Sequence, residues 1–261
     1  MHQSFKVIQS VDRSLAILDS LAKASDIGSS LGEISRDTGL HASTAHHLLA
    51  TLISRQVVEQ DAITKLYRLG IHLIELGNVA KKATSLTRLA MPFIEAAWDA
   101  TQQATSLLIF HGLVRTPIIS LDSQKMLTAQ HAPLEPRTLH ATGSGKLLLA
   151  FLPEGELENY LQRYRLERFT ANTIANGDVL CQELEKIRQQ GYALDHEEYG
   201  DGVRCISAPI HDATRQVAGC LDVVYPIFDV EDEQVREWIG DITRNAAGLS
   251  GQLRSFELVI R

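Results

Sequence analysis

The chain has 261 residues, of which 44% are hydrophobic and 22% charged, the composition of a globular protein with room for two domains. Its formal net charge is −7 and no apolar run is long enough to cross a bilayer, so we expect a cytoplasmic protein rather than a membrane protein. The three cysteines Cys181, Cys205 and Cys220 are odd in number and far apart, which argues against a disulfide framework or a zinc site.

Charge is divided unevenly along the chain. Residues 1–82 carry nine Lys and Arg against eight Asp and Glu, a balance of +1, whereas residues 83–261 carry sixteen against twenty-four, a balance of −8. Binding of nucleic acid depends on the charge of the local face, so this division permits it in the first part of the chain despite the acidic total.

The first predicted element is a helix over residues 11–23. Its apolar side chains recur at helical spacing and are expected to face inward on one stripe. The residues of this stripe are Val11, Leu15, Leu18 and Leu21.

Two further short helices are predicted on either side of a glycine turn. Ser30 and Glu33 have the spacing of a capping box, so a helix should begin there and run to about Thr38. Gly39 can adopt the left-handed conformation that ends a helix, and a second helix should start near His41. This arrangement is typical of a helix-turn-helix that presents its second helix to DNA.

The second helix has distinct inner and outer sides. Its apolar residues Ala45, Leu48, Leu49, Leu52 and Ile53 share one face. The polar residues that remain for the DNA major groove are Ser43, Thr44, His46 and His47. The alternative is a small three-helix unit that serves protein contacts instead.

Residues 56–69 contain two β-prone runs around a polar turn, the pattern of the hairpin in a winged domain. We expect Lys65, Tyr67 and Arg68 to contact phosphates, which position a protein on the duplex without reading its sequence.

A linker helix is predicted over residues 70–83, with an apolar stripe that includes Ile71, Ile74 and Val79. A second amphipathic helix should cover residues 87–103 and bury Leu89, Phe93, Ala96 and Ala97; Pro92 requires that it start late or bend. These elements divide the chain into a winged helix-turn-helix domain, residues 1–82, and a second domain, residues 83–261.

The second domain is expected to belong to the α+β class, because strands in hairpins alternate with grouped helices around an antiparallel sheet. The predicted strands cover residues 105–113, 116–121, 127–131, 193–196, 204–210 and 217–225, and the predicted helices cover residues 145–152, 154–164, 179–190 and 231–254.

Three stretches of this domain, residues 139–153, 168–174 and 191–210, resemble signatures of the IclR family of bacterial transcriptional regulators. The resemblance covers residues 10–253. It implies an N-terminal winged helix-turn-helix, a GAF-like effector-binding domain, and homodimers that often pair into tetramers on double-stranded operator DNA.

A ligand site is expected at Gly143, Ser144 and Gly145, where a predicted helix starts, because unpaired backbone N–H groups and the helix dipole there favour an anion such as a small organic acid. The resemblance implies an effector pocket formed by Ala129, Gly143, Ser144, Asp195, Cys205, Asp222 and Val224. Strand alternation places Cys220, Asp222 and Val224 on one side of their strand. Many relatives carry two serines on that strand, so Asp222 should disfavour a second carboxylate and instead accept a hydrogen bond from a hydroxyl or an amine.

The rival class of function is an enzyme. It would use Cys205 as a nucleophile with His196 or His211 as base and Asp195 as orienting group. A metal-dependent version would use His196, Glu197, Glu198 and His211. Neither version explains the helix-turn-helix, and we expect a regulator with no cofactor.

Two structural interpretations remain open for the same residues. In the first, Cys205 is a small buried hydrophobe. In the second, Asp195, Glu197 and Glu198 cap a strand end or pair with Arg204. The Gly143–Lys146 run lacks the length of a phosphate-binding loop, so nucleotide hydrolysis is rejected.

The resemblance also indicates a departure in the recognition helix. Relatives commonly carry proline, lysine and arginine where this chain has His41, Ala42 and His47. Because imidazoles gain their charge near neutral pH, we expect DNA binding that tightens as the pH falls, with a shallower salt dependence than in relatives.

Overall fold

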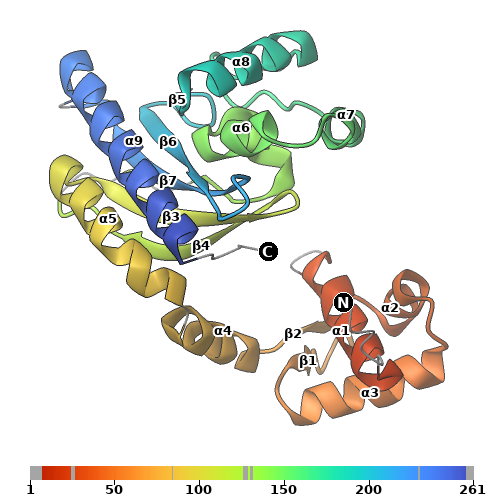
Figure 1. The fold of residues 1–261 in the computed structure, drawn as a ribbon. Coiled ribbons are helices and arrows are strands. Elements are labelled where there is room, and N and C mark those ends of the chain that lie inside the picture. The colour runs from red at the N-terminus through yellow and green to blue at the C-terminus, as the bar shows by residue number, and fades with distance from the viewer. Residues whose placement is uncertain are drawn as a thin grey trace. The chain divides into compact units, whose positions relative to one another are not determined.

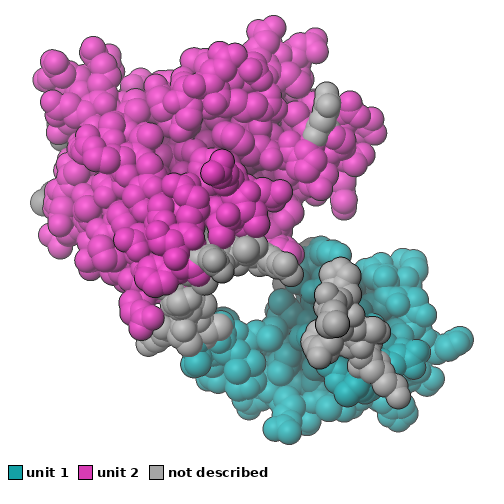
Figure 2. Space-filling model, in the orientation of Figure 1, with its two compact units in different colours: residues 1–83 teal, residues 84–261 magenta. Residues whose placement is uncertain are grey.

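The computed structural model describes residues 8–24, 27–83, 85–125, 129, 132–228 and 230–256. The chain forms two compact units, residues 1–83 and residues 84–261, which are coloured separately in Figure 2. Each unit is described by itself. No helix among the described residues is both long enough and apolar enough to span a membrane.

Unit 1 contains three helices, a two-stranded antiparallel hairpin and a further helix (Figure 1). The predicted capping box is present: the Ser30 hydroxyl accepts from the Glu33 N–H at 3.3 Å, and the Glu33 carboxylate accepts from the Ser30 N–H at 2.7 Å. Gly39 ends the second helix with φ of 67°. The elements are α1 (Gln9–Ala22), α2 (Leu31–Thr38), α3 (Ala42–Ser54), β1 (Val58–Gln60), β2 (Tyr67–Leu69) and α4 (His72–Ala83).

The residues of α1 that are buried in the core of unit 1 are not all those predicted. Ile17 and Leu21 are buried there, whereas Val11 and Leu15 are each 55% exposed, so their predicted inward position is wrong. Helix α1 contacts α2, α3 and β2, and Ile17 and Leu21 are its residues in the shared core. The remaining buried core residues are Ile34, Leu49, Val58 and Tyr67.

The apolar residues of the linker helix are exposed within the described chain. Ile71, Ile74, Leu76 and Val79 are all more than half exposed, with Ile74 at 60%. A row of large apolar side chains of this kind on one short segment is typical of a surface that another chain covers.

Unit 2 is built on a five-stranded antiparallel sheet with strand order β4-β3-β7-β6-β5. Helices α5 and α9 cover one face, and α6 to α8 lie on the other face (Figure 1). The strands are β3 (Ala104–His111), β4 (Val114–Leu121), β5 (Ala193–His196), β6 (Val203–His211) and β7 (Val217–Pro226). The helices are α5 (Ser85–Thr101), α6 (Gly143–Ala150), α7 (Glu154–Arg163), α8 (Gly177–Gln190) and α9 (Asp232–Ser255).

Helix α5 corrects two details of the prediction. It contains Pro92 in its interior without a late start, and Ala96 is exposed, while Ala90, Ile94 and Ala97 form the buried side. Ala97 is buried and Phe93 packs against the core as predicted, so Ala96 is the predicted inward residue that lies on the exposed side; the faces of α5 are set by its contacts with α9, β3 and β4.

Strand β7 separates the two layers of unit 2 as its alternation predicted. Leu221, Val223 and Tyr225 belong to the core beneath α5 and α9. Cys220 and Val224 belong to clusters on the opposite face. The predicted strand 127–131 lies outside the described residues except for Ala129, and a short 3-10 helix over Pro136–Ala141 was not predicted.

Candidate functional site

The outer face of α3 matches the predicted DNA face in its exposure. Ser43, His46 and His47 are exposed, and Thr44 is half-buried. The buried side consists of Ala45 and Leu49, with Leu48, Leu52 and Ile53 packed against the core. A groove of DNA would therefore meet polar side chains of this helix.

The hairpin corrects one predicted phosphate contact. Tyr67 is 5% exposed and packs in the core of unit 1, so its side chain is not available to a phosphate. The reason is strand alternation: Tyr67 points inward, whereas its neighbour Arg68 is exposed. Tyr67 also forms a backbone bridge with Ser29, whose N–H donates to the Tyr67 carbonyl at 3.0 Å.

Lys65 and Arg68 remain exposed on this hairpin. Lys65 lies in the turn with φ of 59°, and Arg68 lies 3.5 Å from the Asp61 carboxylate. Hydrogen bonds from the backbone N–H groups of Thr64 and Ile63 lower the pKa of Asp61. The ionised Asp61 carboxylate would therefore compete with a DNA phosphate for Arg68.

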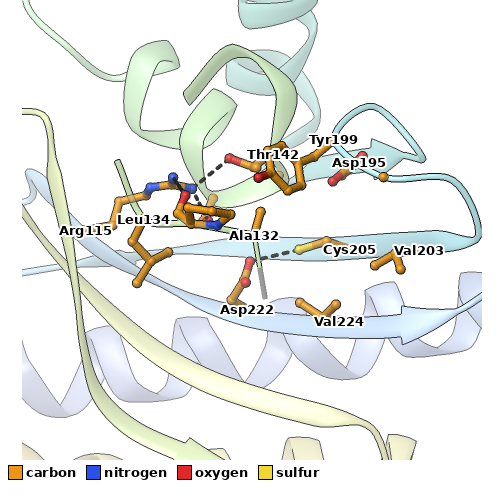
Figure 3. Close-up of a pocket in the computed structure, with 14 residues that line it drawn as sticks. Arg115, Ala132, Leu134, Thr142, Asp195, Tyr199, Val203, Cys205, Asp222 and Val224 are labelled. Carbon is orange, nitrogen blue, oxygen red and sulfur yellow. Dashed lines mark hydrogen bonds between the residues drawn. The ribbon is translucent and has the colours of Figure 1, made fainter. Parts of the chain in front are cut away.

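A cavity of about 410 Å³ in unit 2 brings together most of the predicted effector residues (Figure 3). It lies between the first turn of α6 and strands β6 and β7, with the β5–β6 loop at one side. Ala129 packs beside the cavity against Cys205 and Val224. The predicted residues that line the cavity are Gly143, Ser144, Asp195, Cys205, Asp222 and Val224.

The first turn of α6 approaches the sheet closely. A Cβ atom at Gly143 would lie 2.7 Å from the Ser207 hydroxyl and 3.1 Å from the Cys205 sulfur, so a larger residue would displace one of them. The Thr142 hydroxyl caps the helix by accepting from the Gly145 N–H at 3.2 Å. Gly143 and Ser144 lie in the first turn of α6, where backbone N–H groups have no acceptor within the helix. These groups can donate hydrogen bonds to an anion.

Asp222 forms the polar floor of the cavity. Its Oδ1 accepts from the Cys205 thiol at 3.0 Å and from the Ser207 hydroxyl. Burial and the neighbouring Asp222 charge raise the pKa of Cys205 well above its usual range, so the thiol stays protonated. This neutral, buried sulfur lacks the thiolate character of a nucleophile.

The histidines of the enzyme hypothesis do not reach Cys205. His196 is exposed on β5, where the neighbouring Asp195 is buried and lines the cavity. His211 lies at the other end of β6, with its ring 6.4 Å from that of Phe151. Within the described residues no cluster of His, Cys, Asp and Glu could hold a metal ion, so the metal-dependent version has no site there either.

Asp195 is a buried carboxyl at the edge of the cavity. Burial raises its pKa to about 7, with the neighbouring Glu198 contributing in the same direction and a hydrogen bond from the Glu198 N–H opposing the shift. That N–H donates to Asp195 Oδ1 at 2.7 Å. Asp195 therefore changes its protonation state near neutral pH.

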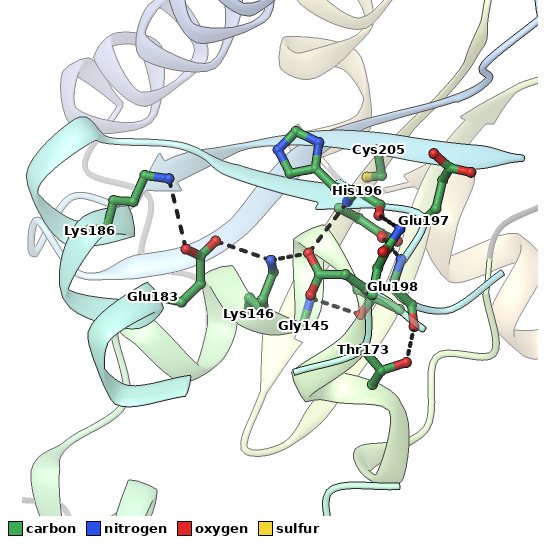
Figure 4. Close-up of polar contacts among 12 residues, drawn as sticks. Gly145, Lys146, Thr173, Glu183, Lys186, His196, Glu197, Glu198 and Cys205 are labelled. Atoms are coloured by element: carbon green, nitrogen blue, oxygen red, sulfur yellow. Dashed lines mark hydrogen bonds and ion pairs between the residues drawn. The ribbon is translucent and has the colours of Figure 1, made fainter. Parts of the chain in front are cut away.

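Lys146, Glu183 and Glu198 form a cluster of ion pairs (Figure 4). The fully buried Lys146 ammonium lies 2.5 Å from Glu198 and 3.1 Å from Glu183. Thr173 donates to the Glu198 carbonyl at 2.6 Å, which gives the stretch 168–174 a structural role in holding this loop. Lys146 thus serves a structural ion cluster rather than a phosphate loop, and Glu197 pairs with Arg204 at 3.4 Å as the structural interpretation expected.

Arg115 on β4 is the main cavity residue that sequence reasoning missed. Its side chain is 2% exposed and donates to Thr142 at 2.7 Å and to Ser144 at 2.9 Å. A charged residue inside a β-prone segment was the available signal, because such a side chain is buried only with dedicated partners. The cavity residues not predicted are Arg115, Ala132, Pro133, Leu134, Thr142, Tyr199, Gly200 and Val203.

The sequence matches two profiles that together span most of the chain. The profile of the bacterial transcriptional regulator IclR C-terminal domain matches residues 79–250, and the profile of the IclR helix-turn-helix domain matches residues 10–62. The chain belongs to the IclR family. It is accordingly a DNA-binding transcriptional regulator and not an enzyme.

Curated relatives agree with this assignment. The regulator BhcR of Paracoccus denitrificans is 32% identical over 243 residues, which cover 93% of this chain and 86% of BhcR. The regulator XynR of Escherichia coli is 32% identical over 248 residues, which cover 95% of this chain and 98% of XynR.

Solved structures share the fold. IclR of Thermotoga maritima has a TM-score of 0.62 at 27% identity, covering 94% of this chain and 99% of its own. An IclR homologue from Microbacterium hydrocarbonoxydans, solved in complex with 4-hydroxybenzoate, has a TM-score of 0.66 at 22% identity, with coverage of 94% and 99%.

Proposed function

We propose that this IclR-family regulator binds operator DNA through α3 and that a small organic acid in the cavity of unit 2 controls this binding. Ser43, Thr44, His46 and His47 would meet the major groove. The exposed cations of the hairpin, Lys65 and Arg68, would contact the flanking phosphates.

The effector proposal depends on one observation: the first turn of α6 and several buried polar side chains line the same cavity. The first turn of α6 offers backbone N–H donors to a carboxylate, while Asp195 on β5 and Asp222 on β7 line the same cavity as acceptors. The homologue that holds 4-hydroxybenzoate supports an organic acid as the class of ligand. Such a ligand acts only if its affinity differs between the DNA-bound and free arrangements.

We also propose that the regulator is a homo-oligomer in the cytoplasm. The exposed apolar residues of α1 and α4, among them Leu15, Ile74 and Val79, would be buried against the same surfaces of a second copy. Two copies related by a two-fold axis would read a pseudo-palindromic operator, as dimeric helix-turn-helix proteins do.

The test uses the intact protein and genomic DNA fragments selected by binding. Fluorescence anisotropy measures DNA affinity with and without compounds from a panel of organic acids, for the wild type, Ser144→Ala and Asp195→Ala. Both variants should keep DNA binding and lose the response to the active acid, whereas Lys186→Ala, an exposed change on α8, should respond like the wild type. An unchanged response in both cavity variants contradicts the assignment of the site.

A further inference from the structure

The most exposed large apolar side chain among the described residues is that of Ile63, in the turn of the hairpin. It is 91% exposed, against 70% for the next, Ile27. Exposed turns normally consist of small and polar residues, as the neighbouring Ala62, Thr64 and Lys65 are. Folding removes almost none of the Ile63 side chain from water, so this isoleucine does not stabilise the fold by burial.

Hydrogen bonds fix the turn that carries Ile63. Asp61 Oδ1 accepts from the N–H groups of Ile63 and Thr64, at 2.9 Å and 2.8 Å. The Asp61 N–H donates to the Leu66 carbonyl at 2.9 Å, and the Lys65 N–H donates to the Asp61 carbonyl at 3.0 Å. Single exposed apolar residues are common on protein surfaces, but this one is held in the solvent by a turn whose backbone is bonded at both ends and at Ile63 itself.

The hairpin is also fixed to the recognition helix α3, which it follows directly (Figure 1). Val58 of β1 and Leu49 of α3 belong to the same buried core, and the Val57 N–H donates to the Leu52 carbonyl at 3.0 Å. The placement of α3 on DNA therefore also places the tip of the hairpin. A minor groove adjoins each major groove of B-DNA, so a projection beside a helix in the major groove can reach the minor groove next to it.

Positive charges accompany the apolar tip. Lys65 is exposed in the same turn, and Arg68 is exposed on β2. An apolar side chain beside cations matches a groove of DNA, in which phosphates line both edges and stacked base pairs form the floor. The cations therefore favour DNA, rather than an apolar protein surface, as the partner of the tip.

We propose that Ile63 is an apolar wedge that enters the minor groove beside the α3 site and inserts at a flexible pyrimidine–purine step, which it partly unstacks and kinks. The inference rests on the proposed function, because it takes α3 to lie in the adjacent major groove. Isoleucine is among the side chains that serve as such wedges, and pyrimidine–purine steps are those that unstack most easily. Ile63 thereby adds a sequence preference that needs no hydrogen bond to a base.

Ile63→Ser tests the apolar contact in the intact protein, with a duplex that the wild type has selected from random sequence. Anisotropy should show an affinity about tenfold lower or less, because the burial of an isoleucine side chain on DNA is lost. The salt dependence should stay unchanged, since an apolar contact releases no counterions. Ile63→Leu should retain most of the affinity, and Ala62→Ser, the matched control in the same turn, should bind like the wild type.

The kink is measured on the DNA. Energy transfer between dyes at the two ends of the duplex should show a stronger bend with the wild type and Ile63→Leu than with Ile63→Ser. The fluorescent base 2-aminopurine, placed in turn at each step that flanks the α3 site, should brighten at one step with the wild type and not with Ile63→Ser. Replacing that step by adenine–adenine should weaken wild-type binding by about threefold or more and leave Ile63→Ser unaffected.

Three results would overturn the proposal. The first is an equal affinity or an equal bend for Ile63→Ser and the wild type. The second is a duplex in which no step brightens with the wild type. The third is a changed oligomeric state of Ile63→Ser in gel filtration, because Ile63 would then contact protein rather than DNA.

His47→Ala, on α3, distinguishes this proposal from the proposed function. If His47→Ala weakens DNA binding and Ile63→Ser does not, binding through α3 stands and the wedge fails. If Ile63→Ser weakens binding and removes the kink while His47→Ala and Ser43→Ala bind like the wild type, the insertion of Ile63 stands and binding through α3 fails.

Discussion

The candidate residues of the two units lie in opposite surroundings. On α3, Ser43, His46 and His47 stand on an exposed helix face, and the helix keeps them there by burying Ala45 and Leu49. In unit 2 the polar residues of the cavity are buried and form hydrogen bonds with one another, such as the bond from the Cys205 thiol to Asp222. Changes on the exposed face should therefore affect DNA binding alone, whereas changes around the cavity should affect folding and ligand binding together.

The largest effect is expected in the buried ion cluster. Lys146→Met should lower the free energy of unfolding of unit 2 by about 4 kcal/mol, because Glu198 would remain buried without its cation. Urea unfolding followed by the fluorescence of the two tryptophans, Trp98 and Trp238, which both belong to unit 2, measures this change. Adding Glu198→Gln should recover part of the loss, and Lys186→Ala should have little effect; a stable single variant would contradict the role of the cluster.

Asp195 gives stability a pH dependence. Its folded pKa of about 7 lies above the ~3.9 of an unfolded aspartate, so its contribution is full below pH ~4 and is lost as the pH rises through about 7. Asp195→Asn keeps an acceptor for the Glu198 N–H and cannot ionise. Between pH 5 and pH 8 it should gain about 3 kcal/mol relative to the wild type, measured by urea unfolding at both values. Parallel pH profiles of the two proteins would refute the shifted titration.

On the recognition helix α3, a substitution should change DNA binding and leave stability unchanged. His47→Ala should weaken DNA binding by roughly tenfold while ligand binding and melting temperature stay unchanged, because the side chain is exposed. Anisotropy with the selected DNA and calorimetry with the active acid measure the two properties. A matched loss of ligand affinity would show that the two units are not separable in this way.

The smallest effect is expected on the hairpin. Arg68→Ala should reduce the dependence of log affinity on log salt by about 0.9, the value of one phosphate contact, with little loss of stability. Tyr67→Phe is the matched control on the neighbouring residue: the ring stays buried, so the salt dependence should not change. A reduced slope in Tyr67→Phe would restore Tyr67 as a phosphate contact.

Local rules account for the parts of the fold that the sequence predicted well. The capping box of Ser30 and Glu33 and the turn at Gly39 depend on residues a few positions apart, and both are present. Strand alternation likewise placed Asp222 and Val224 on the cavity side of β7. The same rule, applied to the hairpin, predicts that Tyr67 points inward and Arg68 outward. The predicted phosphate contact of Tyr67 was wrong because it treated these neighbouring residues as one face of the strand.

The sequence by itself determined the helix-turn-helix, the winged hairpin and the order of the elements in unit 2, because each follows from spacing within a short segment. Only the tertiary structure decided what surrounds Arg115. Its partners Thr142 and Ser144 lie 27 and 29 residues further along the chain and reach it through the packing of α6 on the sheet. Whether a charge is compensated depends on such distant neighbours, and no local pattern records them.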